Sequence, residues 1–249
     1  MTERSGSLRL NKYIAESGIC SRREADRMIG EGRVTVDGEP AEAGMRVTYS
    51  QKILADGREI CPGPESVMIA FNKPAGIICT SEVRDGTVNI YQYLNYPQRI
   101  FSAGRLDKNS EGLLLLTNDG NLANEIMRAR NHHEKEYDVT VDKAVTPEFL
   151  KRMQSGVPIL GVTTRRCSAV QTGKCSFRIV LTQGLNRQIR RMCEELGYKV
   201  RRLKRIRIMN IVLGDLPSGG YRNLTAEEKQ ELERLLSADR AEEDKDGGK

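Results

Sequence analysis

The sequence of 249 residues contains no tryptophan and only two histidines, His132 and His133, which are adjacent. Its six cysteines include no Cys-x-x-Cys pair, so we expect reduced thiols and neither a zinc cluster nor a disulfide framework. No apolar run approaches the roughly 20 residues that a membrane-spanning helix needs, which excludes a transmembrane protein. The first residues show no apolar stretch and no small-residue cleavage site, so we expect no secretory signal and a cytoplasmic location.

Positive charge is in slight excess and is concentrated late in the chain. Forty lysines and arginines against 34 acidic residues give a net charge of +6, which favours a polyanionic partner. Residues 187–207 contain nine basic residues and only two glutamates. The excess within this one stretch is larger than the net charge of the whole chain.

Two short helices are predicted near the start of the chain. The segment LNKYIAESG places three apolar side chains on one helical face, and Gly18 favours a left-handed turn that ends the helix. Ser21 and Glu24 have capping-box spacing and predict the start of a second helix. That helix turns one apolar face inward and presents three arginines on its other side, Arg22, Arg23 and Arg27.

A hairpin is predicted directly after these helices. The run RVTVDGEP alternates apolar and polar residues and contains Asp37-Gly38, a strong signal for a tight turn. Two helices and a small hairpin sheet, with arginines along an exposed helix face, resemble the α-L RNA-binding module of ribosomal proteins and RNA-modifying enzymes. The resemblance implies that these arginines contact RNA, whereas their charge alone is equally consistent with a solvated face.

A linker rich in proline and glycine at residues 61–66 divides the chain. We expect an N-terminal RNA-binding domain at 1–62, a catalytic domain at 63–237 and a disordered tail at 238–249. Expected strands lie at 67–71, 76–81, 99–103, 113–117, 135–142, 176–183 and 206–213, and expected helices at 120–129, 147–155, 187–196 and 226–236. Because the two types are interspersed without regular alternation, we predict the α+β class, with helices flanking a mixed, mainly antiparallel sheet.

The most informative motif is GRLDKNSEGLLLLT at residues 104–117. A charged loop bracketed by glycines precedes a strand too apolar to be anything but buried. Asp107 is therefore expected at the rim of a sheet, where a carboxylate can line a cleft. On the residues alone, a structural aspartate that caps a turn is the alternative interpretation.

Several segments, in the same order, resemble the RsuA/RluB/RluE/RluF family of rRNA pseudouridine synthases. They are the α-L module, NKPAG at 72–76, the GRLD segment, KEYDVTV at 135–141 and GLNRQIRRMCEELGY at 184–198. Two further segments, HHEKEYDVTVD and SGVPILG, are most similar to the RluF branch, which acts on large-subunit rRNA. The resemblance covers nearly the whole chain and implies an enzyme that converts one specific uridine to pseudouridine.

By this resemblance Asp107 is the catalytic carboxylate. The reaction breaks the bond between uracil N1 and ribose C1′, turns the base, and joins C5 to C1′. This change is redox-neutral, so no cofactor or metal is expected, and the sequence contains no Walker loop or dinucleotide-binding fingerprint. Whether the carboxylate attacks the sugar or removes a ribose proton to give a glycal stays open.

A carboxylate that stays ionised inside a cleft needs a nearby cation. The helix predicted after Gly184 carries Arg187, Arg190 and Arg191 on a face different from its apolar one. The resemblance makes Arg190 the partner of Asp107. It leaves Arg187 and Arg191 as RNA contacts, and the alternative is that all three arginines bind phosphates or face solvent.

The resemblance also assigns a role to a tyrosine, and an arginine two residues before Asp107 lies on the same side as the carboxylate if the backbone is extended. Tyr137 is expected to stack on the uracil and to handle its C5 proton, although the alternation of its strand alone predicts a core tyrosine. Arg105 is expected to fill the place of the everted base or to hold its phosphate. Eversion is needed because the glycosidic bond is inaccessible inside a helical stem.

The basic stretch 199–207 is expected to form a phosphate-contacting surface near the active site that includes Lys204 and Arg205. A basic strand without a partner is the alternative. Leu213 is expected to provide an apolar wall for the base.

Two competing functions stay open at this point. One is a non-catalytic RNA-binding or ribosome-assembly factor, but a protein that only binds RNA has no physical need for an acidic residue among arginines. The other keeps the chemistry and changes the substrate to small-subunit rRNA or tRNA. The expected partners are ribosomal RNA and ribosome-assembly intermediates, and we expect a monomer.

Overall fold

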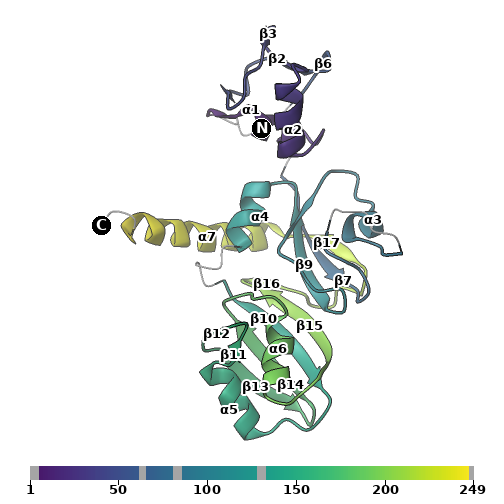
Figure 1. Ribbon diagram of the computed structural model, residues 1–249, viewed down its shortest axis with the longest axis vertical. Helices are drawn as coiled ribbons and strands as arrows, with labels where there is room; N and C mark the ends of the chain where they lie inside the picture. Colours follow the sequence, from purple (N-terminus) through teal and green to yellow (C-terminus); the bar gives the residue numbers. More distant parts are fainter. Residues whose placement is uncertain (1–5, 62–65, 81–85, 128–132, 247–249) are drawn as a thin grey trace. The chain divides into compact units, whose positions relative to one another are not determined.

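The computed structural model describes residues 6–61, 66–80, 86–127 and 133–246, with side chains up to residue 238 (Figure 1). These residues divide into two compact units. The first unit contains the residues up to Ser66 together with Pro97–Arg99, and the second contains Val67–Tyr96 and the residues from Ile100 onward. The predicted boundary between residues 62 and 63 lies outside the described residues.

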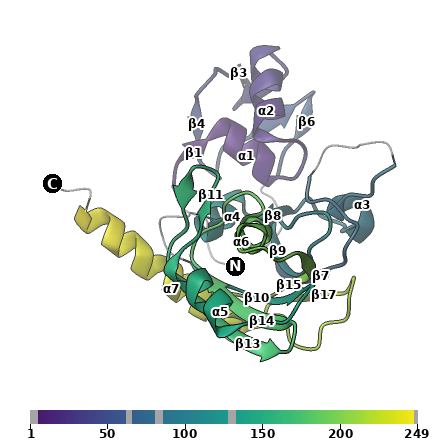
Figure 2. The same cartoon turned by 60° about the horizontal axis from the view of Figure 1, so that its bottom comes forward.

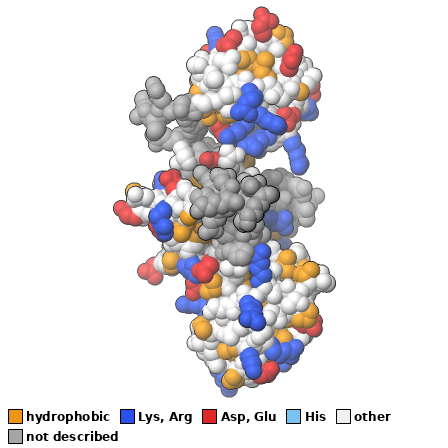
Figure 3. All heavy atoms as spheres, turned by 90° about the vertical axis from the view of Figure 1, so that its left-hand side faces the viewer, with side chains coloured by type: hydrophobic (Ala, Val, Ile, Leu, Met, Phe, Trp, Pro, Cys, Tyr) orange, Lys and Arg blue, Asp and Glu red, His pale blue; other side chains and the backbone are white. Residues whose placement is uncertain are grey.

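The N-terminal unit combines two helices, α1 (Leu10–Glu16) and α2 (Arg22–Gly30), with short strands. Four strands form one sheet in the order β3-β2-β5-β6, and two more pair with each other. Their bounds are β1 Leu8–Arg9, β2 Val34–Val36, β3 Glu39–Pro40, β4 Arg46–Val47, β5 Ile53–Ala55 and β6 Arg58–Glu59. Figure 3 shows basic side chains gathered on one face of this unit.

Local signals in this unit are confirmed. The Oγ atom of Ser21 accepts a hydrogen bond from the backbone N–H of Glu24 at 3.0 Å, so α2 begins where the capping spacing predicts. Gly18 has a φ of +89°, and Asp37 and Gly38 have φ of 52° and 93°, as the tight turn between β2 and β3 requires. The three arginines of α2 are exposed.

The second unit is built on a nine-stranded sheet with the main order β13-β14-β10-β15-β9-β7-β17. Every described pairing in it is antiparallel except that of β15 with β9, which confirms a mixed, mainly antiparallel sheet. The strands are β7 Met68–Lys73, β8 Phe101–Ala103, β9 Glu111–Thr117, β10 Lys135–Val141, β13 Ser168–Gly173, β14 Ser176–Leu181, β15 Val200–Ile208, β16 Ile211–Val212 and β17 Tyr221–Asn223.

Helices cover both faces of this sheet. Their bounds are α3 Ile90–Leu94, α4 Gly120–Met127, α5 Pro147–Ser155, α6 Gln188–Glu195 and α7 Ala226–Asp246, and a small hairpin joins β11 Pro158–Ile159 to β12 Val162–Thr163. Helices α5 and α6 pack on one face of β10, β13 and β14 (Figure 2). The β9 leucines alternate between a core shared with α4 and α7 and a core shared with α3, so this strand is buried on both faces.

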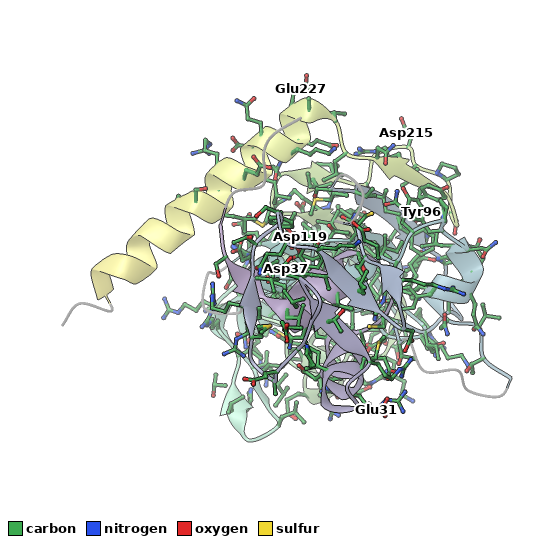
Figure 4. The ribbon with its side chains drawn as sticks, turned by 90° about the horizontal axis from the view of Figure 1, so that it is seen from above. Glu31, Asp37, Tyr96, Asp119, Asp215 and Glu227 are labelled. Atoms are coloured by element: carbon green, nitrogen blue, oxygen red, sulfur yellow. The ribbon has the colours of Figure 1, made fainter. Side chains whose placement is uncertain are left out.

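Acidic side chains lie at the N-termini of two helices in this unit. Asp119, labelled in Figure 4, accepts hydrogen bonds from the backbone N–H groups of Asn121 and Leu122 at 2.8 and 3.2 Å. Glu227, in the first turn of α7, places negative charge at the positive end of that helix (Figure 4). Among the described residues, no helix has the combined length and apolar character needed to cross a bilayer.

Three expectations about elements differ from the structure. The run 76–81 was expected to be a strand, but its described part makes only an isolated bridge between Ile78 and Asn89, because β9 and β17 already occupy both edges of β7. The strand expected at 206–213 is divided by a turn between β15 and β16. Disorder was expected from residue 238, yet α7 continues to Asp246. Alanine, glutamate and lysine in that segment favour propagation of a helix that has already formed.

Gly112 lies opposite Arg205, where the two strands β9 and β15 pair in parallel. A Cβ atom added there would lie 2.2 Å from the carbonyl oxygen of Arg205, and the φ of Gly112 is +100°. We predict that Gly112→Ala lowers the free energy of unfolding by about 3 kcal/mol through overpacking and backbone strain. Urea denaturation measures this change.

Gly120→Ala is the matched control, because a Cβ atom at the start of α4 meets no atom within 4 Å. We expect its stability to stay within about 1 kcal/mol of the wild type. Equal stability of the two variants would show that the close approach at Gly112 does not constrain the fold.

Candidate active site

A cavity of about 440 Å³ lies beside α6 in the second unit. Its walls come from the loop between β8 and β9, from the strands β10, β14 and β15, and from the segment that leads into α6. Asp107, Tyr137, Arg187 and Arg205 all line it. The structure thus brings together side chains that are far apart in sequence.

A buried lysine fixes the loop that carries Asp107. Lys73, at the end of β7, has no exposed surface, and its ammonium group donates hydrogen bonds to the carbonyl oxygens of Pro74 and Ser110, both at 2.8 Å, and more weakly to that of Lys108. Burial lowers the pKa of Lys73. Lys73 lies in the NKPAG segment without a predicted role, although a lysine at the end of an apolar strand indicates a buried cation.

The ion pair of Asp107 is formed with Arg187, whose Nη1 lies 4.0 Å from the Oδ2 of Asp107. The prediction had placed Arg190 in that position. Arg187 is the N-cap of α6 and has a left-handed φ of 51°, so its side chain does not follow the helical spacing that the sequence suggested. Being half exposed, this pair is worth little by itself.

The guanidinium group of Arg190 holds the same loop by hydrogen bonds to it. Its Nη2 donates to the carbonyl oxygen of Asn109 at 2.9 Å and to the Oγ of Ser110 at 3.3 Å. Only 8% of Arg190 is exposed, so it lies on the buried side of α6 rather than on a face apart from the apolar one. Burial and the charge of Arg187 lower the pKa of Arg190, whereas Asp107 raises it, so the carboxylate is within electrostatic reach.

The sheet supplies the opposite wall of the cavity. Tyr137 of β10 is half-buried, packs against the core under α5 and α6, and is paired across the strands with Arg205. Arg205 was expected on a phosphate-contacting surface, but it is 3% exposed and its Nε donates to the carbonyl oxygen of Leu113 at 2.7 Å. Its Nη2 has no hydrogen-bond partner among the described residues.

Three more basic residues of the stretch 199–207 also differ from the expectation, whereas Lys199 and Arg201 are exposed. Lys204 lies opposite Asp138 in the register of the two strands. Because strand residues alternate, it is on the face of the sheet away from the cavity. Arg202 binds Glu111 at 2.5 Å, and Arg207 binds two glutamates. Because Arg202 and Arg207 pair with glutamates and Lys204 lies on the other face, these side chains do not form one continuous phosphate-binding surface beside the cavity.

The remaining predicted residues fall into separate places. Leu213, expected to be a wall for the base, is buried in the core shared by β7, β9 and α7, because the turn after β15 reverses the chain. Arg105 is exposed and lines the cavity. Arg191 donates to the carbonyl oxygen and the side chain of Asn186 and so holds the segment before α6.

A carboxylate, a tyrosine and several guanidinium groups around one cavity, on a mixed sheet with helices on both faces, define the class of RNA-modifying isomerases that the sequence resembles. Residues 67–195 match the model of the RNA pseudouridylate synthase family, and residues 8–53 match the S4 domain. The chain belongs to the RNA pseudouridine synthase family and carries an N-terminal S4 domain.

Similar proteins agree with this assignment. The chain is 52% identical to the dual-specificity RNA pseudouridine synthase RluF of Salmonella typhi, over 95% of this chain and 82% of that protein. It is 36% identical to the ribosomal large subunit pseudouridine synthase B of Bacillus subtilis, over 91% of this chain and 96% of that protein. A crystal structure of a pseudouridylate synthase matches with a TM-score of 0.65 and 31% identity, covering 92% of this chain and 99% of the other.

Proposed function

We propose that this pseudouridine synthase isomerises a uridine of large-subunit ribosomal RNA and that Asp107 is its catalytic carboxylate. One observation carries the assignment of Asp107. Among the described residues that line the cavity of about 440 Å³, it is the one carboxylate, and it faces Arg187 at 4.0 Å. A protein that only binds RNA gains nothing from a loop that holds a negative charge against phosphates.

The chemistry needs a nucleoside that has left its helical stack. In the cavity, Tyr137 offers an aromatic ring for the uracil, and Asp107 lies on the loop across from the sheet. From there the carboxylate either bonds to C1′ or removes the proton of C2′ as the N1–C1′ bond breaks. Both routes end with C5 joined to C1′ and with the C5 proton released.

The arginines have separate roles in this proposal. Arg187 compensates the charge of Asp107, and Arg190 positions Asp107 through the loop backbone. Arg105 is exposed beside the cavity and fills the place of the everted base or binds its phosphate. Arg191 fixes the segment that leads into α6 and offers its remaining N–H groups to the RNA backbone.

We predict that Asp107→Asn abolishes pseudouridine formation while the RNA dissociation constant changes by only a few-fold. The amide keeps the shape of the side chain but can neither attack the sugar nor accept a proton from it. Release of tritium from C5-labelled uridine in ribosomal RNA measures turnover, and filter binding measures affinity. Turnover by the asparagine variant at the wild-type rate would refute the role of Asp107.

The proposed RNA target follows from the relatives. The Bacillus subtilis relative is named as a large-subunit enzyme and the Salmonella typhi relative as a dual-specificity enzyme. The chain covers most of the length of both. Dual specificity makes a second RNA, such as a tRNA, the alternative substrate. We further propose that the protein acts as a monomer in the cytoplasm, on free rRNA or on ribosome-assembly intermediates.

Mapping by carbodiimide modification and primer extension tests the target. Cells that lack the gene should lose one reverse-transcription stop in large-subunit rRNA, and the wild-type gene should restore it. The Asp107→Asn gene is the control and should leave the stop missing. Loss of a stop in small-subunit rRNA alone would contradict the proposed substrate.

The S4 domain is proposed to dock the RNA through α2. Arg22, Arg23 and Arg27 lie exposed on this helix, although Arg27 also pairs with Glu24 at 2.5 Å. We predict that replacing all three by glutamine weakens RNA binding and reduces the slope of log K against log salt by up to about 3. Fluorescence anisotropy over a range of salt concentrations measures both quantities.

The control removes one arginine elsewhere, by Arg234→Gln in α7, where the side chain pairs with Glu231. This variant should bind RNA as the wild type does. An unchanged salt slope in the triple variant would show that α2 does not contact phosphates.

A further inference from the structure

A lysine in the wall of the cavity has no role in the function described so far. Lys135 is the first residue of β10, two positions before Tyr137, and both side chains line the cavity. Its ammonium group donates a hydrogen bond to the carbonyl oxygen of His133 at 3.2 Å. An ammonium group can donate three hydrogen bonds, so most of its capacity is left for a ligand.

The surroundings of Lys135 are mostly cationic or apolar. Leu181 lies opposite it on β14. The titratable or charged side chains that share the cavity with Lys135 are Arg105, Asp107, Tyr137, Arg187 and Arg205. Burial, and secondly the charge of Arg205, lower the pKa of Lys135 to about 8. Among the described residues, Asp107 is the one anion at this cavity, and it is already paired with Arg187.

Arg205 is the second cation of this wall. It is 3% exposed and lines the cavity, and its Nη2 has no hydrogen-bond partner among the described residues. Two neighbouring cations without an anion between them are costly in a partly desolvated wall. Such an arrangement is typical of a site that acts on a group which becomes negatively charged.

We propose that Lys135 and Arg205 stabilise the negative charge that develops on the uracil when it separates from the ribose. This inference rests on the proposed catalytic role of the cavity. When the N1–C1′ bond breaks, its electron pair leaves with the base and spreads over N1, O2 and O4. The wall that carries Tyr137 also carries both cations, so a base that stacks on Tyr137 lies beside them.

The charges balance over the whole reaction. When the N1–C1′ bond breaks, Asp107 either bonds to C1′ or removes the C2′ proton. Either step is reversed when C5 of the uracil donates the electron pair that forms the new bond to C1′. The base then loses its C5 proton and gains one at N1. Lys135 keeps all its protons throughout and acts by its charge alone, as a preorganised electrostatic contact.

Substitutions of Lys135 test this role. We expect Lys135→Met to lower the single-turnover rate at saturating RNA roughly 100-fold, with the RNA dissociation constant within a few-fold of the wild type. Lys135→Arg, which keeps the charge, should recover most of that loss. Lys174→Met removes an exposed lysine in the turn between β13 and β14 and should leave rate and affinity unchanged.

The pH profile of kcat/KM separates this role from a structural one, because it reports the free enzyme. Lys135 must be protonated to act, so the wild-type value should fall as the pH rises through about 8. Lys135→Arg should show no such fall between about pH 7 and 9, since a guanidinium keeps its proton there. Lys135→Met should be slow and equally flat.

Other outcomes would overturn the inference. Weaker RNA binding with a normal saturated rate in Lys135→Met would make Lys135 a phosphate contact. A rate loss of the same size in Lys135→Arg, or the wild-type pH profile in that variant, would show that its charge does not act on the base. If Asp107→Asn is inactive while Lys135→Met equals the wild type, only this inference fails. If the wild type itself forms no pseudouridine, the proposed function fails first.

Discussion

The position of Asp107 depends on two buried cations that bind the backbone of its loop rather than its carboxylate. Lys73 donates to the carbonyl oxygen of Ser110 and more weakly to that of Lys108 in this loop, and Arg190 donates to Asn109 and Ser110. Hydrogen bonds from charged donors are stronger than neutral ones, and buried donors without partners are costly. Because these donors are buried and cannot bind water instead, they hold the loop. The position of the Asp107 carboxylate at the cavity is fixed as a result.

The same arrangement separates two electrostatic tasks. Cations beneath the loop fix its shape, and cations around the cavity face the substrate. In the described lining, Asp107 is outnumbered by Arg105, Lys135, Arg187 and Arg205. In the proposed mechanism this excess attracts RNA and accommodates charge that moves from sugar to base, while the single carboxylate acts on the ribose. Because Lys135, Tyr137 and Arg205 lie on strands, these three groups do not have to be ordered when RNA arrives.

Much of the fold could be predicted from local patterns. The cap at Ser21, the turn at Asp37-Gly38 and the buried strand of β9 depend on neighbouring residues, so the sequence encodes them directly. The run 76–81 could not be assigned, because whether an apolar segment pairs depends on which edges other strands occupy. The end of α7 was missed since charged composition suits both a long helix and a disordered tail.

The residues of the candidate site could be predicted better than the contacts between them. Motif resemblance identified Asp107, Tyr137 and Arg190 as catalytic. Asp107 and Tyr137 line one cavity, as does Arg187, which was expected only to contact RNA. The pairing of Asp107 with Arg187 depends on the left-handed conformation before α6, which helical spacing cannot show. The burial of Arg205 depends on the register of β15 against β10, where a bulge follows Glu136. Lys135 belongs to the KEYDVTV segment that carries the resemblance, but its place at the cavity comes from the same strand pairing.

The most direct measurement is a crystal structure of the Asp107→Asn protein bound to an RNA stem-loop that contains the target uridine. The account predicts an everted nucleoside in the cavity, with its base on the ring of Tyr137 and its C1′ within about 3.5 Å of the side chain at position 107. A uridine that stays stacked in the RNA, or a ribose turned away from position 107, would contradict it.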